Sequence, residues 1–162
     1  MVDRAGFEGF YRERHDRLVR SCALVLLDLQ AAEEVAAEAF TRLWMAWERL
    51  SDDDHAGGYV YTTAMRLCSK RRARRRREPV GDALPSAATD DLAAAERRRE
   101  VFAALGRLPM GQRQAVVLRD WAGFDTEDVA SMMAIAESTV RVRLARGRAS
   151  LRRILTDQGS EP

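Results

Sequence analysis

Cysteine and histidine are scarce in this chain of 162 residues, which contains two of each. Cys22 and Cys68 form no CxxC pair, and neither has a histidine near it in the sequence. This pattern favours neither a zinc site nor a disulfide framework. The sequence also lacks a cluster of carboxylate, histidine or cysteine residues that could bind a metal or act as a nucleophile. We therefore expect no metal, no cofactor and no enzymatic activity.

Aromatic residues are also few, at 7%, and the chain has only four prolines. Hydrophobic residues nevertheless make up 46% and charged residues 32%, so the chain can bury a core. Alanine, leucine, arginine and glutamate dominate, which favours helices over strands. No segment approaches the roughly 18 apolar residues of a membrane span, and the first residues do not resemble a signal peptide. We predict an all-α, cytoplasmic protein without membrane insertion.

Lys70 is the only lysine among 27 basic residues. Arginine suits bidentate contacts with phosphate and guanine, although a GC-rich coding bias gives the same composition. The net charge of +2 conceals an acidic block at 26–56, a strongly basic block at 57–80, an acidic block at 81–96 and a basic block at 137–155. Such alternation predicts several partners or one composite partner, and solvated helix faces are the simpler alternative.

Apolar residues recur at three- and four-residue steps and predict three helices in the first half of the chain. The three stripes are Phe7, Tyr11, Leu18, Cys22, Val25, Leu26 and Leu29; Val35, Phe40, Leu43, Trp44 and Trp47; and Val60, Ala64, Leu67 and Cys68. The third stripe ends where a run of basic residues begins at Lys70. These helices predict one small bundle over residues 5–77. Residues 78–91 contain proline, glycine and several acids without periodicity, so they predict a linker.

The second half of the chain, residues 92–155, predicts a helical unit with a helix-turn-helix motif. Residues 125–128 (Asp-Thr-Glu-Asp) look like a capping start for a short helix. Residues 134–136 leave room only for a tight turn before a last helix, which begins near Ser138. That helix has Val140 and Leu144 on its apolar face and arginines on the other. A helix, a three-residue turn and a basic helix are typical of DNA-binding proteins.

Two segments resemble a known family. Residues 32–44, "AEEVAAEAFTRLW", are similar to the A-E-D-x-x-Q-E-x-F-x-R-x-W segment of sigma region 2. Residues 108–152, which begin "LPMGQRQAVVLRDW", are similar to the region 4 pattern that begins L-P-x-x-x-R. In this order, over residues 7–155, they resemble the extracytoplasmic-function (ECF, group 4) RNA polymerase sigma factors. The resemblance implies region 2 at 5–77 and region 4 at 92–155, with a linker at 78–91.

By the same resemblance, the protein binds core RNA polymerase, recognises promoter DNA at −35 and −10, and helps to melt it. The expected polymerase contacts, on the β′ clamp, are Glu34, Glu38 and Arg42. The expected −10 contacts are Tyr59, Tyr61, Thr62, Met65, Arg66, Ser69, Lys70, Arg71, Arg72 and Arg74. The expected −35 contacts are Ser138, Thr139, Arg141, Arg143, Arg146 and Arg148. Region 4 is expected to meet the β flap, and the acidic linker (Asp82, Asp90, Asp91) to follow the RNA-exit path or to act as a flexible tether. Whether an anti-sigma factor also binds is left open.

The sequence departs from the family pattern at five positions. Ala37 replaces a glutamine, Arg66 and Lys70 replace an asparagine and an aspartate, Ala134 replaces the glycine of the turn, and Ala136 replaces the serine that caps the last helix. We expect Ser138 to take over as that cap.

Spacings of four, one and four residues predict that Tyr61, Met65, Arg66 and Lys70 share one side of the third helix, suited to a melted single strand. The alternative is that Tyr61 and Met65 pack against the first helix. For the whole protein, the alternative is a stand-alone helix-turn-helix regulator. That alternative leaves the acidic second helix and the basic, aromatic third helix unexplained.

Overall fold

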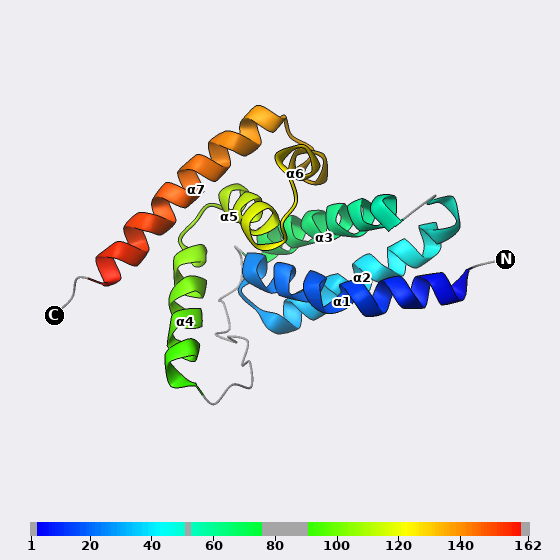
Figure 1. The fold of residues 1–162 in the computed structure, drawn as a ribbon, viewed down its shortest axis with the longest axis horizontal. Coiled ribbons are helices and arrows are strands. Elements are labelled where there is room, and N and C mark those ends of the chain that lie inside the picture. The colour runs from blue at the N-terminus through cyan, green and yellow to red at the C-terminus, as the bar shows by residue number, and fades with distance from the viewer. Residues whose placement is uncertain (1–2, 51–52, 76–90, 160–162) are drawn as a thin grey trace.

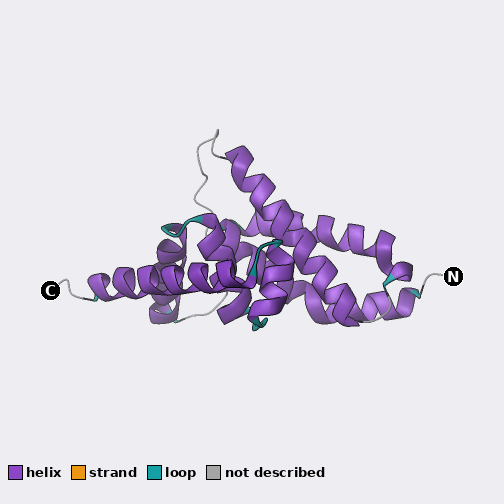
Figure 2. Ribbon diagram, turned by 90° about the horizontal axis from the view of Figure 1, so that it is seen from above, coloured by secondary structure: helices purple, strands orange, loops and turns teal. Residues whose placement is uncertain are grey.

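The computed structural model describes residues 3–50, 53–75 and 91–159, and it confirms the all-α expectation. Figures 1 and 2 show helices joined by short loops throughout this part of the chain. The helices are α1 (Arg4–Leu26), α2 (Leu29–Ala46), α3 (Asp53–Arg75), α4 (Leu92–Gly106), α5 (Met110–Val116), α6 (Thr126–Met133) and α7 (Glu137–Gln158). A 3-10 turn, η1 (Trp47–Arg49), follows α2, and a π-helical turn, η2 (Val117–Trp121), continues α5.

Helices α1, α2 and α3 run alternately up and down as a bundle (Figure 1). Leu27 ends α1 in the left-handed backbone region, with φ of 59°. The next residue, Asp28, caps α2 by accepting a hydrogen bond from the backbone nitrogen of Ala31 at 3.0 Å. This two-residue connection fixes α1 and α2 as antiparallel neighbours. Their shared core with α3 includes the fully buried Leu18, Leu43 and Val60.

In the second unit, α5 and α6 pack against the long helix α7. Val140 and Leu144 of α7 are buried, as their spacing predicts. The α5–α7 contact is close at Gly147, where an added Cβ would lie 2.9 Å from Cγ2 of Val116. A glycine at this point of α7 therefore lets the two helices approach.

The predicted linker lies almost wholly outside the described residues, and so do Asp82, Asp90 and the basic residues 76–77. Its last residue, Asp91, is described and caps α4 through a hydrogen bond from the backbone nitrogen of Ala93 at 3.0 Å.

The two units pack against each other and share one apolar core. Helix α6 lies on α3, and η2 contacts α1 (Figure 1). The sequence predicts each unit but not this arrangement, because an apolar stripe does not specify which element covers it.

Candidate nucleic-acid and protein interfaces

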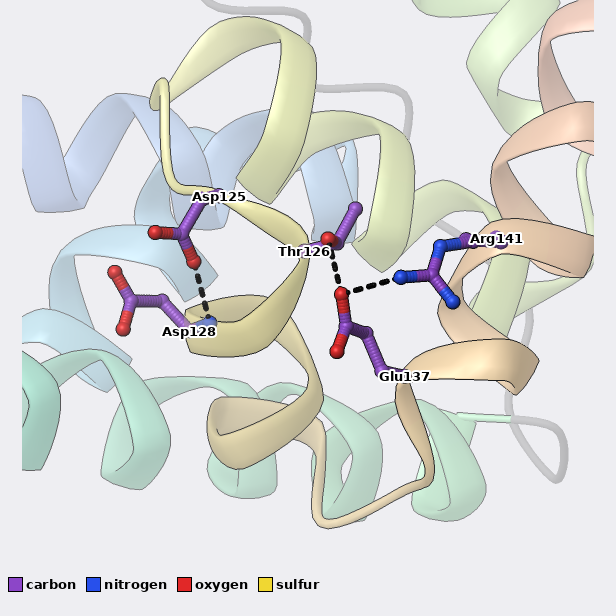
Figure 3. Close-up of polar contacts among 5 residues, drawn as sticks. All are labelled: Asp125, Thr126, Asp128, Glu137 and Arg141. Carbon is purple, nitrogen blue, oxygen red and sulfur yellow. Dashed lines mark hydrogen bonds and ion pairs between the residues drawn. The ribbon is translucent and has the colours of Figure 1, made fainter.

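The two helices of the helix-turn-helix motif begin close together (Figure 3). Asp125 caps α6 by accepting a hydrogen bond from the backbone nitrogen of Asp128 at 2.8 Å, which confirms the predicted capping start. Ala134 makes the turn in the left-handed region, with φ of 54°. Ala136 is the N-cap of α7 and makes no side-chain cap bond. The expectation that Ser138 caps α7 is therefore wrong, because the helix already begins at Glu137.

The first turns of α7 present Ser138 and Arg141 to solvent, with Thr139 half-buried beside them. Arg141 donates to Oε1 of Glu137 at 2.7 Å, and Thr126 Oγ1 donates to the same oxygen at 2.8 Å. Exposed hydroxyl and guanidinium groups at this end of a helix can donate to base edges in a major groove.

Two of the predicted −35 residues do not point freely outward. The guanidinium group of Arg143 lies over the start of α5, where an added Cβ on Gly111 would be 2.7 Å from one of its nitrogens. Arg148 donates two hydrogen bonds to Asp120, at 2.6 and 2.9 Å, and these bonds raise the pKa of Arg148. The expectation that all the arginines of α7 face outward is thus wrong for Arg143, while Arg146 is exposed.

The predicted single surface of Tyr61, Met65, Arg66 and Lys70 on α3 is not formed in this structure. Arg66 and Lys70 are exposed, whereas Tyr61 and Met65 are each 2% exposed. A one-residue step on a helix turns the side chain by about 100°, so the two pairs lie on neighbouring ridges that face different surroundings.

The second unit packs against the Tyr61 ring and bonds to the backbone of Met65. The Tyr61 ring packs edge-on against Phe124, with ring centroids 4.8 Å apart. Gln114 Nε2 donates to the Met65 carbonyl oxygen at 3.2 Å and to Ser69 Oγ at 2.9 Å. Burial raises the pKa of Tyr61, and a hydrogen bond with Ser21 of α1 opposes this shift. The alternative prediction, packing against α1, is thus correct in part for Tyr61, because this residue contacts both α1 and the second unit.

Other predicted −10 residues line a cavity of about 480 Å³ at the start of α3. Tyr59, Thr62 and Arg66 contribute to its wall. The rest of the wall comes from Leu50, His55, Gly58, Thr63 and, in α6, Ser131. Further along α3, Lys70 and Arg74 are exposed, and Arg71 and Arg72 are half-buried.

Helix α2 presents the expected acidic face, because Glu34 and Glu38 are exposed. Arg42 donates to Glu38 at 2.5 Å, one turn away. Glu34 accepts a hydrogen bond from Arg71 of α3, so a predicted polymerase contact and a predicted DNA contact are paired with each other.

An apolar patch beside this acidic face was not predicted. Met45 is 72% exposed and Trp44 is 38% exposed, with the Trp44 ring edge-on to Phe7 at 4.8 Å. The sequence assigned Trp44 to the core and overlooked Met45. The sequence signal that could have revealed Met45 is its position: it is an apolar residue that directly follows Trp44 but lies outside the predicted apolar stripe of α2.

Arg113 of α5 was also overlooked as a structural residue. It is fully buried, and it donates to the carbonyl oxygen of Val25 at 2.7 Å and to those of Gly106 and Leu108 at 3.2 Å. Burial, helped by nearby Arg72, lowers the pKa of Arg113 to about 10. The available signal was the arginine of the L-P-x-x-x-R pattern, which comes just before an apolar run in the sequence.

The described residues are also relevant to three other features: a metal site, a membrane span and a disulfide. They contain no group of three or more histidine, cysteine or acidic side chains arranged to hold a metal ion. No helix of the same part is long and apolar enough to cross a membrane. Cys22 and Cys68 are buried free thiols, and their mutual hydrogen bond, together with burial, raises the pKa of Cys68.

A helix-turn-helix unit with an exposed arginine at the start of its second helix is the architecture of a DNA-binding protein. The sigma-70 region 2 family model matches residues 10–78, and the sigma-70 region 4 model matches residues 97–151. The ECF RNA polymerase sigma factor SigM of Mycobacterium tuberculosis is 31% identical over 94% of this chain and 79% of its own length. RNA polymerase sigma-E factor of Streptomyces coelicolor is 30% identical over 90% of this chain and 84% of its own.

Two solved structures share the whole fold. One is the sigma factor RpoE in complex with the anti-sigma factor NepR from Bartonella quintana, with a TM-score of 0.77, 20% identity, and coverage of 93% of this chain and 97% of that one. The other is CnrH in complex with the cytosolic domain of CnrY, with a TM-score of 0.74, 18% identity, and coverage of 96% and 90%. The chain belongs to the ECF RNA polymerase sigma factors, and it directs promoter-specific initiation of transcription.

Proposed function

We propose that this sigma factor is a non-enzymatic, cytoplasmic subunit whose region 2 spans residues 5–77 and whose region 4 spans residues 92–155, joined by the linker 78–91. The main support for the proposal is that one chain exposes an acidic surface on one helix and a basic surface on another. Helix α2 offers Glu34 and Glu38, and the start of α7 offers Arg141. A protein that only bound DNA would gain nothing from an acidic face next to its basic surfaces.

The acidic face of α2 docks on core polymerase, at the β′ clamp by family resemblance. Glu34, Glu38 and Arg42 are the polar contacts, and exposed Trp44 and Met45 add apolar area at the edge. Protein interfaces commonly combine apolar area with charged and polar groups, as this face does. Region 4 docks on the β flap.

The −35 element is read by the N-terminal turns of α7. Ser138, Thr139 and Arg141 reach base edges, and Arg146 contacts phosphate. Arg148 contributes to phosphate binding only if its pair with Asp120 opens, and Arg143 supports the start of α5.

The −10 element is held by α3. Once α6, which contributes Ser131 to the cavity, has moved away, the α3 wall of Tyr59, Thr62 and Arg66 receives a base that leaves the stack, and the basic residues that follow hold the separated strand. These strand contacts are Ser69, Lys70, Arg71, Arg72 and Arg74. Tyr61 and Met65 join this surface only after α5 and α6 leave α3, because both side chains are buried here and Phe124 packs on Tyr61.

The arrangement seen here is accordingly a closed form, which must open for −10 recognition. The two solved structures with this fold are each of a complex with another protein. An anti-sigma factor for this chain would bind the closed form and preserve the contact between Gln114 and Met65. Hydrogen exchange at the backbone of α3 would then be no faster with the anti-sigma factor than without it.

Run-off transcription with core polymerase over a promoter library tests the proposed function. The chain should co-elute with core polymerase and select promoters by their −35 and −10 sequences. A stand-alone regulator would bind duplex DNA without co-elution and without supporting initiation by core polymerase.

A further inference from the structure

One carboxylate oxygen links the two helices of the helix-turn-helix motif. Oε1 of Glu137, the first residue of α7, accepts hydrogen bonds from Thr126 Oγ1 at 2.8 Å and from Arg141 at 2.7 Å (Figure 3). Thr126 is the first residue of α6, so the link joins the starts of both helices.

The Thr126 bond distinguishes this pair from an ordinary ion pair on a helix surface. An exposed pair one turn apart holds its side chains weakly, because both can rotate in solvent. Here the carboxylate is also held from a different helix, by a half-buried threonine. Glu137 also lies at a helix N-terminus, where the helix dipole favours a negative charge. Its carboxylate therefore has a fixed place from which to orient Arg141.

The link leaves Arg141 able to read a base. A guanidinium group has five N–H donors, and the bond to Glu137 uses one of them. The remaining donors suffice for a bidentate contact with O6 and N7 of guanine, the commonest specific contact of arginine with DNA. The other arginines of α7 differ. Arg148 is paired with Asp120, and Arg146 has no ion-pair partner on the described part of the chain.

We propose that Glu137 is the positioning residue of the −35 contact: held by Thr126, it orients Arg141 toward one guanine and keeps it away from the phosphates. The proposal rests on the proposed role of α7 in −35 recognition. The carboxylate also repels the DNA backbone, so it lowers the affinity for every sequence while it raises the preference for one. Specificity at this base pair is thus a property of three residues on two helices.

The test uses the full chain bound to core polymerase and a set of duplexes with each base pair at every −35 position. Arg141→Ala should remove the preference for guanine at one position, a change of about tenfold or more. Glu137→Ala should reduce the preference at that same position by a similar factor, with equal or higher affinity for scrambled duplex. Thr126→Val should give a smaller loss at the same position.

Two controls separate positioning from general effects. Glu127→Gln removes the equal negative charge of an exposed α6 side chain that has no bond to Arg141, so it should change the affinity for all duplexes alike. Glu137→Ala combined with Arg141→Ala should be no worse in selectivity than Arg141→Ala alone, because Glu137 acts only through Arg141. Far-UV circular dichroism and the thermal midpoint should stay near wild type in all these variants.

Different results overturn different claims. If Arg141→Ala leaves selectivity unchanged, direct base readout by Arg141 is wrong. If Arg141→Ala removes the preference but Glu137→Ala does not, only the positioning role is wrong. A loss of preference at a different base pair in Glu137→Ala would instead show a direct contact by the carboxylate, and that too would contradict positioning.

Discussion

Arg113 in α5 donates a hydrogen bond of 2.7 Å to the carbonyl oxygen of Val25, 88 residues earlier in α1. The bond joins region 4 to the end of the first helix of region 2. Because the guanidinium group is fully buried and charged at neutral pH, its carbonyl partners compensate for part of its lost hydration. The contact between the two regions therefore combines apolar packing with a specific polar bond.

Replacing Arg113 with methionine should destabilise the protein by about 2 to 4 kcal/mol, because three carbonyl oxygens lose their donor. Urea unfolding followed by circular dichroism measures this loss. Arg107→Met, at an exposed arginine just after α4, is the matched control and should change stability by less than about 0.5 kcal/mol. Equal urea midpoints for the two variants would show that the buried hydrogen bonds of Arg113 contribute nothing to the free energy of unfolding.

Loosening the contact between regions should favour the open form. Phe124→Ala combined with Gln114→Ala removes the ring that packs on Tyr61 and the donor to Met65. Dyes on cysteines introduced at Gln30 in α2 and Ala149 in α7, both exposed, report the separation by energy transfer. We expect lower transfer in the double variant and no change in Trp121→Ala, which removes an exposed ring nearby. Unchanged transfer in the double variant would mean that other contacts alone keep the regions together.

Charge reversal on α2 should prevent docking on polymerase. Glu34→Arg with Glu38→Arg should abolish co-elution with core polymerase, because a partner surface complementary to an acidic face repels a basic one. Glu8→Arg with Glu13→Arg, at exposed positions of α1, makes the same charge change elsewhere and should leave co-elution intact. A folded Glu34/Glu38 variant that still co-elutes would rule out this face.

DNA melting can be tested without disturbing the core. Substituting Tyr61 confounds stability with function, because the side chain is buried. Arg66→Ala with Lys70→Ala removes two exposed cations of α3 instead, and should leave thermal stability and −35 binding near wild type. Permanganate reactivity of thymines near −10 should fall, and a template already mismatched there should restore transcription. Failure of that template to restore activity would exclude a melting role for these two residues.

The turn of the helix-turn-helix motif is strained at Ala134, where φ is 54°. A left-handed backbone costs an ordinary residue about 1 kcal/mol or more, and glycine avoids this cost. Ala134→Gly should therefore stabilise the protein by about 0.5 to 1 kcal/mol, seen as a higher thermal midpoint. Ala145→Gly, at an exposed position inside α7, should have the opposite sign and a similar size. A lower midpoint for Ala134→Gly would contradict the strain.

The local features of this fold were predictable from the sequence. The stripes containing Leu18, Leu43 and Val60 predict the three-helix bundle, and the Asp125 cap and the short turn after Met133 predict the helix-turn-helix motif. These features depend on residues a few positions apart, where helical spacing and capping chemistry determine the structure.

The contacts between the two regions were not predictable in the same way. Helical spacing predicts that Tyr61 is part of a DNA-binding surface beside Arg66, yet the ring of Phe124, 63 residues later, packs against it. Arg143 shares a helix face with other arginines but lies over Gly111. Such outcomes depend on which unit packs against which, and helical spacing within one element carries no information about that choice.

The core that the two regions share also affects how tightly this protein can bind polymerase. A partner that needs the open form binds only the fraction of molecules that are open, so the apparent dissociation constant equals the intrinsic one divided by that fraction. If one molecule in about a hundred is open, binding is weakened about a hundredfold. Changes at Arg113, Gln114 or Phe124 that alter this fraction would therefore change the competition between this sigma factor and others for a limited pool of core enzyme, although none of the three need touch polymerase or DNA.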